Sequence, residues 1–166
     1  MKYTATINWT KSPAENFEGG KYSRVHKWTF DGGMQFNASS SPHIVPVPMS
    51  DPSFIDPEEA FVASIASCHM LFFLSFCAKR KYIVTHYEDN AEGILDKADD
   101  GRMQMTNVTL HPLVKFEGDK PSDDTILLLH EMAHNNCFIA NSIKTKIDIS
   151  HKPAEQTASP APAGSQ

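Results

Sequence analysis

One long apolar segment dominates the pattern of hydrophobic and polar positions. Between residues 60 and 78 the chain carries no Asp, Glu, Lys or Arg, and most side chains are apolar or small. Pro57 suits the first turn of a helix, where its missing N–H is not needed. Acids follow at positions 58 and 59, and Lys79 to Lys81 close the segment, which complements the helix dipole. We therefore predict a helix over 56–80 that is buried on most sides.

The flanking regions alternate apolar and polar positions, as half-buried strands do. The predicted elements are a strand over 3–9, a hairpin of 22–30 with 34–38, strands over 82–92 and 102–116 with a turn at 99–101, a helix over 123–135 begun by Ser122, a short turn or third helix around Cys137, and a last strand over 143–149. Residues 39–55 contain four prolines and are predicted to form an ordered or lid-like loop. This order predicts a single α+β domain over 1–152, followed by a low-complexity, disordered tail over 153–166.

Charge and length narrow the class of protein. The formal net charge is −5, from 15 basic and 20 acidic side chains, and the basic residues form no stripe. A mildly acidic chain of this kind argues against binding nucleic acid or anionic membranes. The N-terminal residues lack the apolar core of a signal peptide, so we expect a cytoplasmic protein whose three cysteines stay reduced.

The apolar segment is also long enough to cross a bilayer. Three serines and His69 interrupt it, and the rest of the chain has the pattern of an α/β-type soluble domain. A core helix covered by a sheet is therefore the favoured interpretation.

A metal site is one hypothesis for the reactive residues. His130-Glu131-Met132-Ala133-His134 matches the H-E-x-x-H pattern of zinc proteases, in which both histidines bind the metal and the glutamate is the base. Cys137 lies three residues further along the same helical stripe. The usual third ligand does not follow, however, because the nearest downstream glutamate, the kind of acid that would complete such a site, is Glu155 in the tail. Two histidines on a packed or solvated helix face are favoured over a zinc hydrolase.

A two-cysteine redox site is the second hypothesis. One of Cys68 and Cys137 would attack an oxidant to form a sulfenic acid, and the other would condense with it into a disulfide. A nearby cation favours the thiolate, and an acid can hold that cation in place. Arg24 and Glu58 are available for these roles.

The third hypothesis is that the cysteines only fill the core, as buried cysteines usually do. Cys77 fits this hypothesis, because it lies nine residues from Cys68 and therefore faces the opposite side of the helix. His69 follows Cys68, but sequence neighbours do not face each other on a helix. We therefore expect His69 to be a hydrogen-bonded core or interface residue rather than a general base.

Three blocks of the chain resemble the OsmC/Ohr family of cysteine-based peroxide reductases. DPEEAFVASIASC at 56–68 resembles the family's Asp-Pro-Glu block, with the reactive Cys ten positions after the Glu. AHNNCFIANSI at 133–143 resembles the block around the second Cys, and YSRVHKWTFDGG at 22–33 resembles the strand that carries the family's Arg. Residues 36–55 depart from the family's Gly-rich loop, and His69 replaces an aromatic residue common in organic-hydroperoxide specialists. The chain is therefore more similar to a general OsmC-like member than to a strict Ohr protein.

The resemblance implies a role for each site residue. Cys68 would be the peroxidatic thiol and Cys137 the resolving one, with Arg24 and Glu58 activating the thiolate and orienting the peroxide. It also implies an intertwined, obligate homodimer of α+β subunits with two long central helices between sheets. The implied activity is the reduction of organic hydroperoxides, and of H₂O₂, by an external dithiol in antioxidant defence, with no metal and no organic cofactor. A non-enzymatic member of the fold that binds a small hydrophobic ligand is the alternative.

Overall fold

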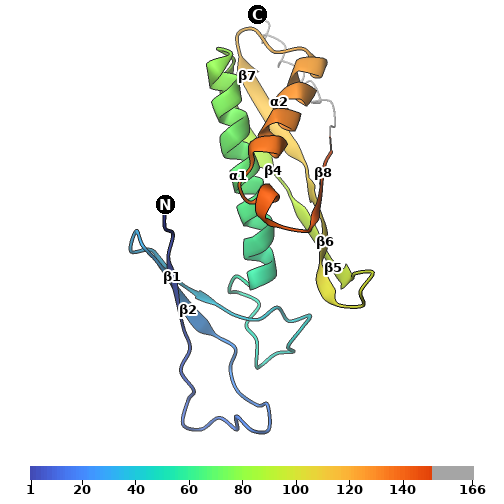
Figure 1. Cartoon of the computed structure of the whole chain (residues 1–166). Coiled ribbons are helices and arrows are strands. Elements are labelled where there is room, and N and C mark those ends of the chain that lie inside the picture. Colours follow the sequence, from blue (N-terminus) through green and yellow to red (C-terminus); the bar gives the residue numbers. More distant parts are fainter. Residues whose placement is uncertain (151–166) are drawn as a thin grey trace, which may run out of the picture. The chain divides into compact units, whose positions relative to one another are not determined.

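The computed structural model describes residues 1–150, and their contacts divide into two compact units, Met1–Ser64 and a second that begins at Ile65. The elements are β1 (Ala5–Asn8), β2 (His26–Phe30), β3 (Gln35–Ala38), α1 (Pro57–Lys79), β4 (Ile83–Asp89), β5 (Glu92–Lys97), β6 (Met103–Leu110), β7 (Pro112–Glu117), α2 (Asp123–Asn136), the 3-10 helix η1 (Ala140–Ser142) and β8 (Lys146–Ile149) (Figure 1). Two helices and several sheets confirm the α+β class. The tail expected over 153–166 lies outside the described residues, and the single domain over 1–152 stays a prediction.

The first unit is built on the antiparallel sheet β1-β2-β3. Trp28 of β2 pairs with Ile7 of β1 and with Phe36 of β3, which confirms the predicted hairpin. Its turn needs Gly33, whose φ of 85° lies in the region that glycine adopts without a steric penalty. β2 begins four residues later than predicted, because the backbone N–H of Arg24 is already bonded to Met49 O at 2.7 Å instead of to a neighbouring strand.

The proline-containing segment 39–55 is an ordered loop with fixed ends. Ser39 N–H donates to Ile55 O at 3.0 Å, and the Ser39 hydroxyl accepts the N–H of Asp51 at 3.0 Å. Ser39 is fully buried. These bonds fix the entry of the chain into α1.

α1 begins with a reciprocal cap formed by Asp56 and Glu59. The carboxylate of Asp56 accepts the N–H of Glu59 at 2.8 Å, while the carboxylate of Glu59 accepts the N–H of Asp56 at 3.1 Å. This capping box satisfies two backbone donors that the helix itself cannot pair. From there α1 runs unbroken for 23 residues.

α1 is the one helix in the described part of the chain that is long and apolar enough to cross a membrane. Length and composition alone are weak evidence, because the core helix of a soluble protein has the same character. The fully buried residues of α1 recur every four positions, which makes one buried stripe; they are Ile65, His69, Phe73 and Cys77.

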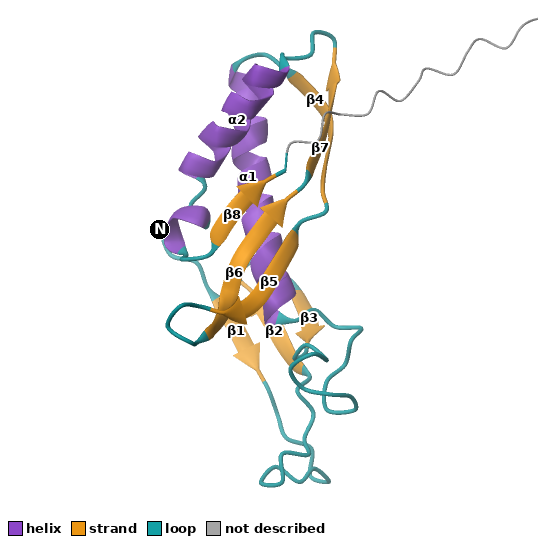
Figure 2. Ribbon diagram, turned by 90° about the vertical axis from the view of Figure 1, so that its right-hand side faces the viewer, coloured by secondary structure: helices purple, strands orange, loops and turns teal. Residues whose placement is uncertain are grey.

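The second unit contains the pair β4-β7 and the sheet β5-β6-β8, in which β8 runs parallel to β6 (Figure 2). The structure has four strands where alternation predicted the two strands 82–92 and 102–116. The break in the second falls at His111, whose N–H is bonded to Asp89 at 2.7 Å, and at Pro112, which has no N–H to donate. The predicted turn at 99–101 joins β5 to β6.

The core of the second unit lies between α1 and α2, which run antiparallel in Figure 1. Phe73 and Cys77 of α1 and Leu129 and Ala133 of α2 form its centre. Side chains of α1, of β4 and β7, and of Tyr82 between α1 and β4 surround this centre; they include Phe72, Phe76, Tyr87 and Phe116. The start of α2 is capped by Ser122, as predicted, through the N–H of Thr125 at 3.3 Å.

Candidate functional site

The second unit brings the two cysteines of the redox hypothesis into contact. Cys68 lies in the middle of α1 and is partly exposed, while Cys137 caps the C-terminus of α2 and is 1% exposed. Both are free thiols, and their side chains lie close enough for Cys68 to raise the pKa of Cys137. Two adjacent thiols, one open to solvent and one covered, can form a disulfide after a small movement.

The two thiols differ in their surroundings. Burial, and secondarily the interaction with the Cys68 side chain, raises the pKa of Cys137 to about 11, although its sulfur accepts the N–H of Ala140 at 3.4 Å. Cys137 therefore stays protonated at neutral pH while Cys68 is reduced. The more exposed Cys68 is the better placed of the two to meet a solute first.

Cys77 is separate from this pair. It lies in the core cluster, 1% exposed, and burial raises its pKa to about 11. Unlike Cys137, Cys77 has no second cysteine in its core cluster, so we expect this buried, protonated thiol to be unreactive, as a core residue is.

In the first unit, Arg24 and Glu58 line one pocket of about 620 Å³. We call it the aromatic pocket, because Trp9, Phe17 and Tyr22 form a cluster of rings in its wall, with centroids 4.6 to 5.8 Å apart. The remaining lining residues come from β1, β2, the loop after β3 and the start of α1; they are Ile7, His26, Ser39, Ser40, Val45 and Pro57. An apolar wall with one cation and one carboxyl group suits a small organic molecule with a polar end.

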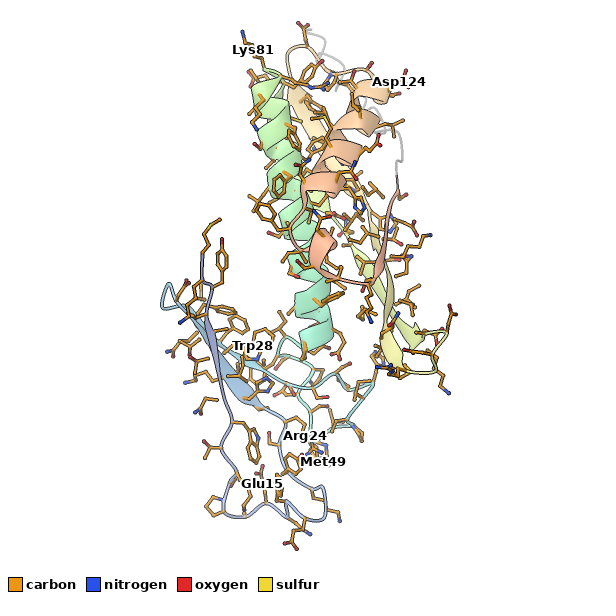
Figure 3. The ribbon with its side chains drawn as sticks, in the orientation of Figure 1. Glu15, Arg24, Trp28, Met49, Lys81 and Asp124 are labelled. Atoms are coloured by element: carbon orange, nitrogen blue, oxygen red, sulfur yellow. The ribbon has the colours of Figure 1, made fainter. Side chains whose placement is uncertain are left out.

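Arg24 is held by its own loop. Its Nη1 donates to Tyr22 O at 2.5 Å and to Gly20 O at 3.3 Å, and the guanidinium lies 3.5 Å from the centre of the Tyr22 ring. Figure 3 shows Arg24 beside Met49, whose carbonyl accepts its backbone N–H. Among residues 1–150 no ion pair joins Arg24 to Glu58, so backbone carbonyls and an aromatic face, rather than an acid, position the guanidinium.

Two residues that support the backbone of Arg24, His26 and Trp28, were not predicted from the sequence. Trp28 Nε1–H donates to His26 Nε2 at 2.7 Å, and His26 Nδ1 lies 2.8 Å from Arg24 O. Since Trp Nε1 can only donate, His26 Nε2 must be the acceptor and Nδ1 must carry the proton. The neutral ring thus links β2 to the backbone of Arg24. The alternating positions 24, 26 and 28 put these residues on one side of the chain, and that alternation was the available signal.

The H-E-x-x-H segment lies on α2, as predicted, but its first histidine has a different partner. His130 Nδ1 is 3.0 Å from Nε2 of His69, and both rings are buried. In the described part of the chain, no three His, Cys, Asp or Glu side chains are arranged to hold a metal ion. The expectation that His69 is a hydrogen-bonded core residue is confirmed.

Comparisons with known proteins agree with this architecture. The model of the family described as OsmC-like protein matches residues 50–152. No curated protein matches the chain. An OsmC-like protein of unknown function from Vibrio cholerae is 48% identical, with a TM-score of 0.89 over 90% of this chain and 98% of that one.

More distant solved structures share the fold. An organic hydroperoxide resistance protein from Elizabethkingia anophelis has 17% identity and a TM-score of 0.65, over 90% of this chain and 92% of that one. The organic hydroperoxide resistance protein OhrB of Bacillus subtilis has 18% identity and a TM-score of 0.63, over 90% and 96%. The chain belongs to the family of OsmC-like proteins.

Proposed function

We propose that this protein is a thiol-dependent peroxidase that reduces organic hydroperoxides, and H₂O₂ as well, in the cytoplasm. One observation carries the proposal: the partly exposed Cys68 touches the buried Cys137, and both are free thiols. Structural relatives described as organic hydroperoxide resistance proteins support the same chemistry.

The reaction has two covalent steps on this chain. The thiolate of Cys68 attacks the distal oxygen of ROOH; the O–O bond breaks, RO⁻ leaves and takes up a proton, and Cys68 becomes a sulfenic acid. The thiolate of Cys137 then attacks the Cys68 sulfur, the S–O bond breaks, and the leaving hydroxide is protonated to water. An external dithiol reopens the disulfide by exchange and is itself oxidised.

Oxidation of Cys68 also changes the second thiol. Burial is the largest cause of the raised pKa of Cys137, and Cys68 adds to it through its side chain and its charge. A neutral sulfenic acid at Cys68 no longer contributes that charge, whereas the effect of burial remains.

The aromatic pocket would supply the apolar surface for the organic group R, with Arg24 and Glu58 at its polar end. Ten residues separate Glu58 from Cys68 on the unbroken helix α1, a rise of about 15 Å, which exceeds the reach of a Glu side chain. We therefore assign Glu58 to the Cys68 of a partner subunit in an obligate homodimer.

The exposed apolar residues of the helices support that dimer. Within one chain α1 buries one stripe only, and Leu71 of α1 and Phe138 after α2 stay 61% and 70% exposed. A second copy that covers these side chains would remove a large apolar area from water.

Thiol counting tests the proposal. Reduced protein titrated with cumene hydroperoxide, and separately with H₂O₂, should lose two thiols per chain. Cys68→Ser should abolish turnover with a dithiol, whereas Cys137→Ser should allow one turnover and leave a sulfenic acid that a diketone probe traps. Retained turnover in Cys68→Ser would refute the assignment. Cys77→Ser is the matched control and should keep turnover.

The size and lining of the aromatic pocket also favour a second candidate, a non-enzymatic protein that binds a small hydrophobic ligand. The same titration separates the two functions. A pure binding protein would show no peroxide-dependent loss of thiols.

A further inference from the structure

Two buried histidines join α1 to α2 beside the cysteine pair. His69 is 1% exposed and His130 is 2% exposed. His69 Nε2 and His130 Nδ1 lie 3.0 Å apart, and the two rings are stacked at 5.3 Å with an angle of 6° between their planes. The proposed reaction uses neither ring.

The pair lies in an apolar environment. The ring of His130 is also stacked on Phe73, with centroids 4.1 Å apart and planes 21° apart, and Phe73 belongs to the core cluster. An apolar pair of similar size would fill this space as well. The histidines add a directional bond, which in a medium of low dielectric is stronger than in water and is made at one relative position of the two helices.

The relative position of α1 and α2 determines how the thiols of Cys68 and Cys137 lie with respect to each other. His69 follows Cys68 directly on α1, so the rotation of the helix that sets one side chain sets the other. Cys137 follows His130 by seven residues, two helical turns, and so lies on the same side of α2. The hydrogen bond between the histidines is therefore a link between two rigid elements, each of which carries one cysteine close by.

We propose that His69 and His130 are positioning residues: their mutual hydrogen bond sets the register of α1 against α2 and so raises the effective concentration of the Cys68 thiol toward Cys137. This inference rests on the disulfide step of the proposed function, but not on its peroxide step. It predicts that loss of the bond makes the Cys68–Cys137 disulfide harder to form and easier to reduce.

Equilibrium with glutathione measures this effect without peroxide. In this exchange the dithiol of the protein is oxidised to a disulfide while one oxidised glutathione is reduced to two thiols, so that electrons and protons balance. The oxidised fraction at each ratio of glutathione forms, read by mass after alkylation, gives the effective concentration of the two thiols.

Two matched pairs of variants separate the effect of the hydrogen bond between His69 and His130 from that of the other contacts of the rings. His69→Met and His69→Gln have the same length, and only Gln keeps a polar atom near the position of Nε2. His130→Leu and His130→Asn likewise differ at the position of Nδ1. We expect the apolar member of each pair to lower the effective concentration about five- to tenfold, the worth of one buried hydrogen bond. This is a rise of about 20 to 30 mV in potential. The polar member should stay within about twofold of the wild type.

A double variant and a core control complete the test. His69→Met combined with His130→Leu should lose no more than either change alone, because both remove the same bond. Leu129→Ala, beside His130 in the core cluster, should reduce the free energy of unfolding but leave the effective concentration unchanged.

Three results would each overturn the inference: equal values for the polar and apolar members of both pairs, an equal shift in Leu129→Ala, or failure of the wild type to form the disulfide in glutathione. If one pair does not fold, the other provides the same comparison. A protein that consumes no peroxide but shows the predicted shifts would refute the peroxidase function and leave the role of the histidines intact.

Discussion

Mixed dimers of two inactive variants give a direct test of where Glu58 acts. Cys68→Ser removes the attacking thiol, and Glu58→Ala removes the carboxyl group at the polar end of the aromatic pocket. Each homodimer should be inactive, or nearly so. In a heterodimer, the Glu58→Ala chain contributes Cys68 and the Cys68→Ser chain contributes Glu58, so one of two sites is complete if the sites are shared between subunits.

The expected magnitude follows from helix geometry and from counting. A rise of about 15 Å along α1 separates Glu58 from Cys68 of the same chain, so a site within one chain would need a break in the helix. α1 has none between Pro57 and Lys79. Random pairing of equal amounts makes about half of the dimers mixed, each with one complete site of two under the two-fold symmetry of such a dimer. About a quarter of wild-type activity should therefore return in the whole mixture, and about half in the purified heterodimer.

The assay is co-refolding of equal amounts of the two variants, purification of the heterodimer by two different tags, and measurement of cumene hydroperoxide consumption with a dithiol. Each variant refolded alone, and a mixture made without unfolding, are the controls. Activity at background in a purified heterodimer would show that Glu58 and Cys68 act within one chain.

Three further outcomes are expected. Arg24→Met should slow alkylation of Cys68 at neutral pH, since the thiolate loses a cation; an unchanged pH profile would place Arg24 outside the site. Cys77→Ala should keep turnover and cost on the order of 1 kcal/mol in the free energy of unfolding, measured with urea. Burial raises the pKa of Cys77 and of Cys137 from the ordinary value of 9.0 to about 11, so the native state keeps these protons after the unfolded chain has lost them. The contribution of these thiols to stability should therefore be complete below about pH 9 and fall as the pH rises toward 11. Cys77→Ala should remove roughly 2 kcal/mol of that alkaline loss, and an alkaline limb unchanged by the substitution would contradict the raised pKa of Cys77.

Much of the fold follows from local rules that the sequence displays. The helix predicted over 56–80 agrees closely with α1, which runs over Pro57–Lys79. The prediction succeeds because its signals are local: a proline and two acids in the first turn, and a basic residue in the last. Ser122 marks the start of α2 for the same reason. The break at His111 was missed because alternation continues through it. What interrupts the strand is the hydrogen bond that the backbone N–H of His111 donates to the Asp89 carboxylate, twenty-two residues away.

The candidate site likewise has parts that the sequence predicts and parts that depend on contacts between distant residues. The blocks around Cys68 and Cys137 were identified by resemblance, and the structure puts the two thiols in contact. Spacing in the sequence could not show that Tyr22 and two carbonyls hold Arg24, or that Trp28 and His26 support its backbone. Such contacts depend on where a loop folds back, which periodicity does not encode.

The H-E-x-x-H segment shows why a short motif needs its tertiary partner before it can be interpreted. On α2 it has the helical context that a zinc site requires, so local structure alone could not decide against one. The deciding residue is His69, 61 positions away in the sequence, whose Nε2 faces the nitrogen that a metal would otherwise take. His69 in turn interrupts an apolar helix at a position where burying an unpaired polar group would be costly, and His130 is the partner that removes this cost. Each histidine is thus the hydrogen-bond partner that the other needs in the core. The pair explains why an apolar helix contains a polar residue at position 69. It also explains why an H-E-x-x-H segment occurs here without a third zinc ligand.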